Sequence, residues 1–337
     1  MEENIRMLLE RQEHSMLSRY ASFSDCSRGR AREEEPCDIR PVYQRDRDRI
    51  IHCKAFRRLK DKTQVFLIPK GDHYRTRLTH TLEVSQIARS ICKALQLNED
   101  LTEAIALGHD LGHTPFGHAG ERALNAVFPG GFRHYEQSLR VVDRLEKDGK
   151  GLNLTYEVRD GIRNHQLKTM PCTMEGKIVR LSDKIAYLNH DIDDAVRGHI
   201  IEETDIPKEL RAYLGNSLTE RLNTFIHDLV MTSRGKAEIA LSPEAERAML
   251  DLKRYMFESV YTNPVAKGEE GKAEAMVKYL YEYYCEHPEK LPEENRLMIG
   301  EGEQTERCVA DYIAGMTDKY AVESFKSLCI PKAWGIY

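Results

Sequence analysis

The chain has 337 residues, of which 31% are charged and 41% hydrophobic, and its 50 basic and 55 acidic side chains give a formal net charge of −5. This composition is typical of a globular protein with a sizeable core, and the lack of a basic excess excludes tight, non-specific binding to nucleic acid. The sequence has no run of about 18 apolar residues, and its first residues are charged, which excludes a membrane span and a secretory signal. We therefore expect a cytoplasmic protein whose eight scattered cysteines are reduced thiols.

The pattern along the chain predicts an all-α fold. Residues 1–41 form an N-terminal arm, because the stretch after Ser15 is rich in Ser, Arg and Glu and lacks apolar periodicity. One small β-hairpin is expected at 64–72, where Gln64 precedes a short apolar run and then Pro and Gly. Helical periodicity predicts a helical core over 42–201 and a C-terminal helical extension over 202–337, packed on the same body. The helices of the core are expected near 43–60, 76–97, 99–111, 118–127, 134–147, 156–164 and 174–200.

Four side chains with metal-ligand character lie on three of these helices. Apolar residues follow His80 at i+4, i+7 and i+11, so His80 is predicted to face the core. His109-Asp110 ends the next helix. Asp183 shares one face of a long helix with Tyr187 and Asp191. Each of these alone also has a structural explanation, as a core histidine, a common dipeptide or a surface helix. Together, two imidazoles and two carboxylates suit Mn²⁺, Fe²⁺, Co²⁺, Ni²⁺ or Zn²⁺, and less readily Mg²⁺.

These four residues and several longer strings of the sequence resemble a known family of enzymes. His80, His109-Asp110 and Asp183 match the H…HD…D signature of the HD-domain metal-dependent phosphohydrolases. The strings YQRDRDRI (43–50), FRRL (56–59), HYRTRLTH (73–80) and GHDLGHTPFGH (108–118) resemble the bacterial deoxyguanosinetriphosphate triphosphohydrolase (dGTPase) branch, with similarity running from about Ser18 to Ile200.

This resemblance implies that water attacks the α-phosphorus of a deoxynucleoside triphosphate (dNTP), giving a deoxynucleoside and intact triphosphate. It implies one divalent ion per site (Mn, Mg, Co, Ni, Fe or Zn), held by His80, His109, Asp110 and Asp183. His118 and Glu121, three residues apart at the start of a helix, can form a proton-transfer couple whose direction stays open. The resemblance also places His113 and His134 near the α-phosphate. A second ion, with ligands from His134 and His165, is the less favoured arrangement.

Substrate contacts are expected from cations and polar groups near these residues. Arg77 lies on the same helix face as His80 and can bind a phosphate, and Lys184 and Tyr187 stand beside Asp183. Tyr187 and Asp191 are candidates for the deoxyribose 3′-hydroxyl, and Gln64 for the base or sugar. Arg58 and Lys60 are weaker candidates, because the arginines near them alternate with aspartates as on a solvated helix face. His190 is interpreted as structural.

Two alternatives and several partners remain open at this point. The chain could be another HD phosphohydrolase, such as a nucleotide phosphomonoesterase or phosphodiesterase, or a nucleotide or single-stranded DNA binder with low activity. The resemblance implies a homo-oligomer, with the arm before Pro41 as a subunit contact. A second dNTP or single-stranded DNA is a candidate regulator, for which the basic segment 27–30 offers a local patch. The base preference of the site is not evident from the sequence.

Overall fold

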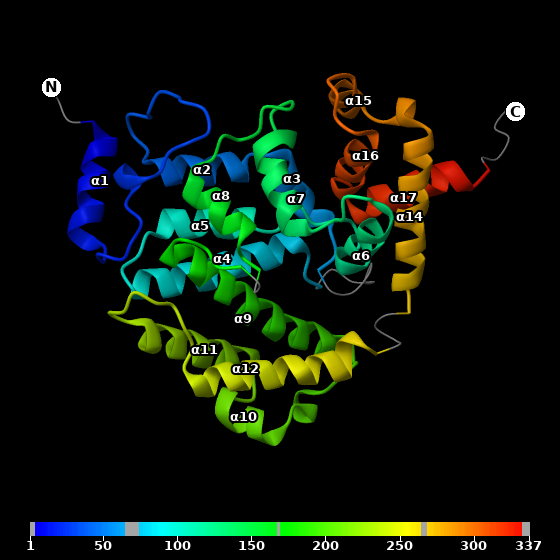
Figure 1. Ribbon diagram of the computed structural model, residues 1–337. Helices are drawn as coiled ribbons and strands as arrows, with labels where there is room; N and C mark the ends of the chain where they lie inside the picture. The colour runs from blue at the N-terminus through cyan, green and yellow to red at the C-terminus, as the bar shows by residue number, and fades with distance from the viewer. Residues whose placement is uncertain (1–3, 65–73, 167–168, 264–267, 332–337) are drawn as a thin grey trace, which may run out of the picture.

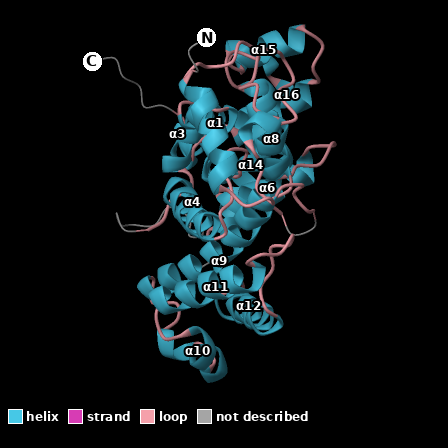
Figure 2. Ribbon diagram, turned by 90° about the vertical axis from the view of Figure 1, so that its left-hand side faces the viewer, coloured by secondary structure: helices cyan, strands magenta, loops and turns pink. Residues whose placement is uncertain are grey.

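The regular structure of the protein is helical. The computed structural model describes residues 4–64, 74–166, 169–263 and 268–331, and these residues form α-helices, short 3₁₀- and π-helical segments and connecting loops, with no β-strand among them (Figures 1 and 2). The all-α prediction is confirmed. The hairpin expected at 64–72 lies, except for its first residue, outside the described residues, and Thr63 and Thr76 on either side pair in a single antiparallel bridge. The helices are α1 (Ile5–Met16), α2 (Val42–Ile51), α3 (Lys54–Arg58), α4 (Arg77–Ala94), α5 (Glu99–Gly108), α6 (Gly117–Val127), α7 (His134–Arg140), α8 (Tyr156–Arg163), α9 (Met174–Arg197), α10 (Lys208–Leu214), α11 (Leu218–Ser233), α12 (Pro243–Met256), α14 (Glu270–Glu286), α15 (Glu293–Gly300), α16 (Thr305–Ala314) and α17 (Asp318–Cys329).

The main hydrophobic core lies between α2, α4, α5, α8 and α9. The apolar stripe of α4, which includes Val84, Ile87 and Ile91, is at most 1% exposed. α5 is buried on nearly all sides, because α2 and α4 cover it from different directions and α8 and α9 pack against it as well. A helix buried on all sides leaves no room for its end to shift, so the residues that follow α5 are held in one place.

α9 connects this core to a second one. Its first half contributes Ile178 and Val179 to the main core, while Ile185, Leu188 and Ile192 further along pack with α10, α11 and α12. These helices form the lower part of the molecule in Figure 1. The chain then returns to the upper part, where α14 and α16 pack against α6 in a third core. The region after residue 201 therefore covers the main core from two separate sides.

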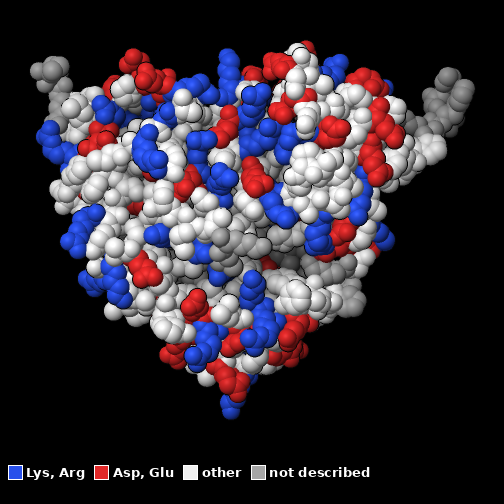
Figure 3. Space-filling view, in the orientation of Figure 1, with Lys and Arg blue, Asp and Glu red and all other residues white. Residues whose placement is uncertain are grey.

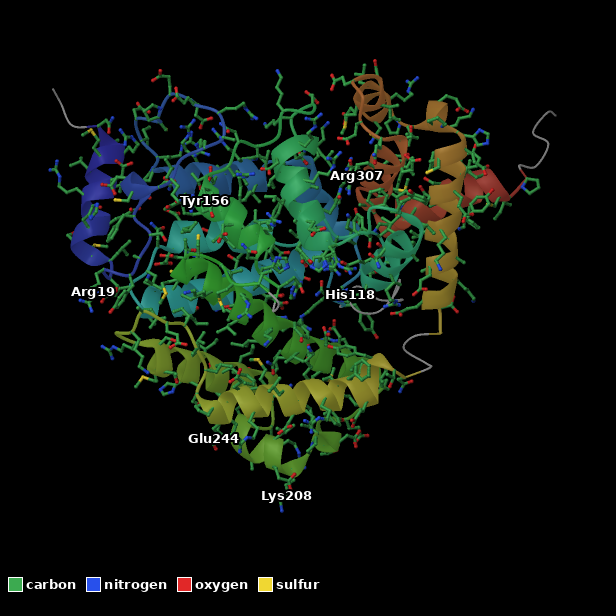
Figure 4. The ribbon with its side chains drawn as sticks, in the orientation of Figure 1. Arg19, His118, Tyr156, Lys208, Glu244 and Arg307 are labelled. Carbon is green, nitrogen blue, oxygen red and sulfur yellow. The ribbon has the colours of Figure 1, made fainter. Side chains whose placement is uncertain are left out.

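The N-terminal arm is fastened to the core by carboxylates. Ser22 donates to Glu175 through its backbone N–H (3.0 Å) and its hydroxyl (2.9 Å). Arg30 donates to the fully buried Asp46, and Asp46 also accepts from the backbone N–H (2.8 Å) and the hydroxyl (2.7 Å) of Thr155. The basic segment 27–30 is thus not a free cationic patch: Arg30 is paired with Asp46, and the Arg28 guanidinium lies 3.6 Å from the ring centre of Tyr156, a residue labelled in Figure 4.

We predict that substituting two aspartates of α2 changes the free energy of unfolding by very different amounts. Replacing Asp46 with Ala removes the buried carboxylate that accepts from Arg30 and Thr155, leaves Glu34 as the remaining ion-pair partner of Arg30, and should lower the free energy of unfolding by about 3 kcal/mol. Asp48→Ala, on the same helix, removes partly exposed ion pairs with Arg40 and Arg47 and should cost about 1 kcal/mol or less. Urea unfolding of both variants measures the difference. Equal costs would show that the Asp46 cluster does not anchor the arm.

Candidate active site

Three helices bring the predicted metal-ligand residues together. His80 comes from α4, His109 and Asp110 follow α5, and Asp183 comes from α9. His80 Nε2 lies 3.1 Å from Asp183 Oδ1, and His109 Nε2 lies 3.4 Å from Asp110 Oδ1 and 3.7 Å from Asp183 Oδ1. Two ligands about 2.1 Å from one ion are about 3.0 Å apart at a right angle and about 3.4 Å apart in a tetrahedron. The spacing of these donor atoms therefore fits a divalent metal ion.

Outer contacts orient these donors. His109 Nδ1 lies 2.6 Å from the carbonyl oxygen of Ala106 and donates to it, so the lone pair of Nε2 faces the cluster. That Nε2 is buried and makes no hydrogen bond within the described residues. Arg77 donates to Asp110 Oδ2 at 2.7 Å, which leaves Oδ1 for the histidines. A histidine fixed by a carbonyl and a carboxylate fixed by an arginine are the supports that metal ligands commonly have.

The electrostatics of the cluster keep its carboxylates ionised. Burial alone would raise the pKa of Asp110, but the nearby His109, His113 and Arg77 hold it well below the usual value. Burial opposes protonation of His80 as well, yet its hydrogen bond to Asp183 raises its pKa. The cluster thus combines two ionised carboxylates with two imidazoles, and all of these residues except Asp183 are nearly fully buried, which favours binding of a cation.

The turn between α5 and α6 is held by close packing against α7. A Cβ on Gly112 would lie 2.1 Å from the backbone nitrogen of Ser138, so only glycine fits there. The Ser138 hydroxyl accepts from the Gly112 N–H at 2.9 Å and donates to the His109 carbonyl at 2.7 Å. The position of the His109-Asp110 pair therefore depends on α7.

The C-terminal helices also hold this turn. Phe116 adopts a left-handed backbone conformation with φ of 63°, which is strained for an aromatic residue. Its N–H donates to Asp318 Oδ1 at 2.9 Å, and the other oxygen of Asp318 accepts from the backbone N–H of Thr63 at 3.0 Å. Asp318 is the first residue of α17, so a helix far along the chain stabilises the strained entry to α6.

Beside this turn lies a row of histidines with one carboxylate at its centre. Glu121 accepts from the backbone N–H of His134 (2.9 Å), and both of its oxygens lie 3.0 Å from His134 Nδ1. It lies 3.4 Å from Nδ1 of His118, whose side chain is 68% exposed. The His113 ring stacks on that of His134 at 3.9 Å between ring centres. The predicted His118–Glu121 pair is present, but the nearer partner of Glu121 is His134. Burial acts against ionisation of Glu121, but its hydrogen bonds to both histidines lower its pKa far below the usual value.

These groups open into one cavity of about 670 Å³, a size common for small-molecule sites. Figure 4 shows His118 on the side of α6 that faces α9 and α12. Most of the residues expected to bind substrate line this cavity, including Gln64, Arg77, Lys184, Tyr187 and Asp191. Arg58 does not. It lines a separate cavity of about 490 Å³ between the core and α15–α16, so the structure does not bring it to the histidines. Lys60 is exposed and lies 3.7 Å from Asp61.

Several residues of the cavity wall were not singled out from the sequence. Gln166 contacts the Nε2 atoms of His134 and His165, and Arg180 donates to the Gln166 carbonyl at 3.2 Å. Lys253 of α12 and Tyr261 come from the C-terminal region, and the Tyr261 hydroxyl donates to Asp191. Tyr261 lies in a π-helical turn (Phe257–Tyr261) that follows α12. Helical periodicity carries no information about such a turn, although a π-turn is itself a frequent feature of functional sites.

Comparison with known proteins places these features in a family. The HD domain model matches residues 77–188, which contain all four metal-ligand candidates, and the phosphohydrolase-associated domain model matches residues 239–327. The deoxyguanosinetriphosphate triphosphohydrolase-like protein of Caldanaerobacter subterraneus subsp. tengcongensis is 57% identical, over 98% of this chain and 97% of that protein. The chain belongs to this family. A deoxyguanosinetriphosphate triphosphohydrolase-like protein of Clostridium perfringens is 50% identical, over 97% of this chain and 98% of the relative.

The HD-domain family assignment makes the chain a phosphohydrolase, and the predicted resemblance is confirmed. A crystal structure of a phosphohydrolase from Bacteroides thetaiotaomicron has the same fold, with a TM-score of 0.53 and 18% identity, over 84% of this chain and 68% of that chain. Over the parts of the chain that the structure describes, no helix combines the length and the apolar character that crossing a membrane requires.

A buried lysine joins the active-site turn of this HD-domain protein to its C-terminal helices. The Lys62 amine is 2% exposed and donates to the carbonyl oxygens of His113 and Ala314. Burial, together with the charge of Arg58 nearby, lowers its pKa to about 7. A neutral amine still has two hydrogens, so both bonds survive deprotonation.

Lys62 predicts a specific pH dependence of stability. In the unfolded chain a lysine keeps its proton up to about pH 10.4, whereas folded Lys62 loses it near pH 7. Between these values the unfolded state binds more protons, so raising the pH stabilises the folded state. Relative to Lys62→Met, the wild type should gain about 2 kcal/mol in free energy of unfolding between pH 7 and pH 9, as measured with urea. Parallel pH profiles for the two proteins would contradict this.

Gly112 predicts a loss of both stability and site geometry on substitution. Gly112→Ala places a Cβ against the backbone of α7 and should destabilise the protein by about 2 kcal/mol or more, with a loss of metal binding. Gly271→Ala is the matched control, because nothing lies within 4 Å of its added Cβ on α14. Thermal unfolding and equilibrium dialysis with Mn²⁺ test both. Wild-type metal binding by Gly112→Ala would show that the turn does not position the ligands.

Proposed function

We propose that the protein hydrolyses dNTPs to a deoxynucleoside and inorganic triphosphate. The observation that carries this proposal is one cavity whose lining includes His80, Asp110 and Asp183 of the His/Asp cluster, His118 and His134, and several cations. The relatives' name, deoxyguanosinetriphosphate triphosphohydrolase-like protein, supports the same substrate class. In the proposed reaction, a water oxygen bonds to the α-phosphorus, the bond from phosphorus to O5′ breaks, and a proton reaches O5′.

We propose His80, His109, Asp110 and Asp183 as the ligands of one divalent ion. Such an ion lowers the pKa of a bound water and stabilises charge on a phosphoryl oxygen. A second ion bound by Asp110, His113 and His134, whose donor atoms lie within 4.8 Å of one another, is disfavoured by their geometry. The His113 and His134 rings are stacked with only 16° between their planes, so an ion in the plane of one ring lies well outside the plane of the other.

The cations of the cavity suit a polyphosphate. Arg77, Arg122, Arg180, Lys184 and Lys253 all contribute to its lining. Lys184 and Lys253 have no carboxylate within ion-pair distance among the described residues, so their charges are available to phosphate oxygens. Elsewhere, on the face shown in Figure 3, Lys and Arg are interspersed with Asp and Glu. We propose that Tyr187 and Asp191, which lie on the same face of α9 and line the cavity, contact the sugar.

The proton for O5′ is assigned to His118. Its side chain reaches the cavity from the start of α6, and the ionised Glu121 can stabilise its protonated form. His134 competes for the same carboxylate but is 5% exposed and bonded on both ring nitrogens, so it is less able to reach a leaving group. We therefore assign proton transfer to His118 and positioning of Glu121 to His134.

The products decide the proposal. The purified protein is incubated with dNTPs and NTPs and with Mn²⁺, Mg²⁺ or Co²⁺, with and without a second dNTP, and the phosphates are separated by anion exchange. Triphosphate is expected from dNTPs, and in ¹⁸O-labelled water the label should appear in the triphosphate. Release of pyrophosphate or orthophosphate would instead indicate another HD phosphohydrolase chemistry.

Two variants separate metal binding from proton transfer. His80→Ala should lose both the bound metal and hydrolysis, whereas His118→Ala should keep the metal and lose about 100-fold or more in kcat. His227→Ala is the control, because His227 is exposed on α11 and outside the cavity lining. Metal content is measured by mass spectrometry and kcat by triphosphate release. Unchanged metal content and rate in His80→Ala would refute the proposed ligand set.

A further inference from the structure

The side-chain amide of Gln166 lies between two buried imidazoles. Its Nε2 is 2.9 Å from Nε2 of His134 and 3.3 Å from Nε2 of His165. The Gln166 main chain is held as well, because its carbonyl accepts from Arg180 Nε at 3.2 Å and from the Thr169 N–H at 3.3 Å. Both the side-chain amide and the main chain of Gln166 are therefore held by hydrogen bonds at the wall of the cavity.

The surroundings determine which ring nitrogens carry hydrogen. His165 Nδ1 lies 2.7 Å from the carbonyl oxygen of Ile162, which can only accept, so this nitrogen is the donor. His134 Nδ1 lies 3.0 Å from both oxygens of Glu121, which accept as well. Because an amide NH₂ group can only donate, the Nε2 atoms of both rings accept from Gln166. An amide NH₂ group has two hydrogens and can donate one to each, whereas an amide oxygen in the same place would face two lone pairs.

These contacts occupy every polar edge of the His134 ring. One edge donates to Glu121, the other accepts from Gln166, and one face stacks on His113. Glu121 is in turn the carboxylate that faces His118. A ring held on two edges and one face cannot rotate or change tautomer without breaking a contact, so Gln166 fixes which ring nitrogen faces Glu121, a carboxylate that the His134 backbone N–H also holds.

We infer that Gln166 is a positioning residue, whose amide holds His134 in its Nδ1–H tautomer and through it orients Glu121 towards His118. The inference rests on the proposed hydrolysis for its catalytic consequence, and on hydrogen-bond geometry alone for the tautomer. Gln166 itself does not touch the reacting atoms. Its loss should therefore lower kcat and leave substrate binding nearly unchanged.

Two substitutions of similar size test this inference in kinetics. Gln166→Met keeps the volume and removes the donors, and Gln166→Glu keeps polarity and shape but offers oxygens in place of the NH₂ group. Both should lower kcat about tenfold or more, with KM within about twofold of wild type. Asn164→Leu is the matched control and should keep the wild-type kcat, because the amide of Asn164, two residues away, donates to Asp160 and not to a histidine. Wild-type kcat in Gln166→Met, or wild-type kcat in Gln166→Glu, would overturn the inference.

A spectroscopic measurement separates this inference from the proposed function. In ¹⁵N-histidine-labelled enzyme loaded with diamagnetic Zn²⁺, His134 of the wild type should show a protonated Nδ1 and an unprotonated Nε2. Gln166→Met should lose this pattern, whereas Asn164→Leu should retain it. An unchanged His134 spectrum in Gln166→Met would overturn the inference. If the wild type cleaves no nucleotide, the proposed function fails separately, and the spectrum still decides whether Gln166 sets the tautomer.

Discussion

The carboxylates of Asp110 and Asp183, which both lie within 4 Å of His109 Nε2, are the constraint on which much of this structure depends. An ionised carboxylate withdrawn from water is costly unless opposite charge and hydrogen bonds replace its solvation. Arg77 donates to one oxygen of Asp110, and His80 contacts Asp183. His109 faces both carboxylates. These groups come from α4, the end of α5 and α9. The packing of those helices therefore brings the opposite charges together, and the two carboxylates are stable in this place only because it does. A divalent cation is the natural further partner of such a cluster.

The same turn that carries Asp110 is supported from distant parts of the chain. α7 packs on Gly112, α17 supplies Asp318 to the strained backbone of Phe116, and Lys62 joins the His113 carbonyl to α16. The C-terminal region is thus part of the active-site scaffold as well as a cover for the core. It also supplies Lys253 and Tyr261 to the cavity, beside residues of α9. Changes in α16 or α17 can therefore reach the site through hydrogen bonds to its backbone.

How far the sequence could predict the site depends on the range of the interactions involved. His80 was predicted to face the core because its helix repeats apolar residues at helical spacing, and Tyr187 and Asp191 were predicted on one face with Asp183 for the same reason. Arg58 was misplaced because a short cationic helix has no internal signal for which cavity it borders. Gln166 was missed because it lies in a loop after α8, where the sequence shows no helical periodicity. Its amide contacts His134 on another element, α7. The basic segment 27–30 was interpreted as a surface patch, because a local charge count cannot show that Asp46 is buried beneath Arg30.

The sequence by itself determined the helical class, the approximate helix positions and the histidine and aspartate residues that we propose as metal ligands, since all of these follow from local periodicity and side-chain chemistry. Only the tertiary structure decided which groups meet. Glu121 contacts His134 more closely than it contacts His118, and Asp110 forms an ion pair with Arg77. Lys253 and Tyr261 join the cavity from beyond Ile200, where the resemblance found in the sequence ends. The physical reason is that contacts between residues far apart in the chain depend on how whole helices pack, and no local pattern encodes that arrangement.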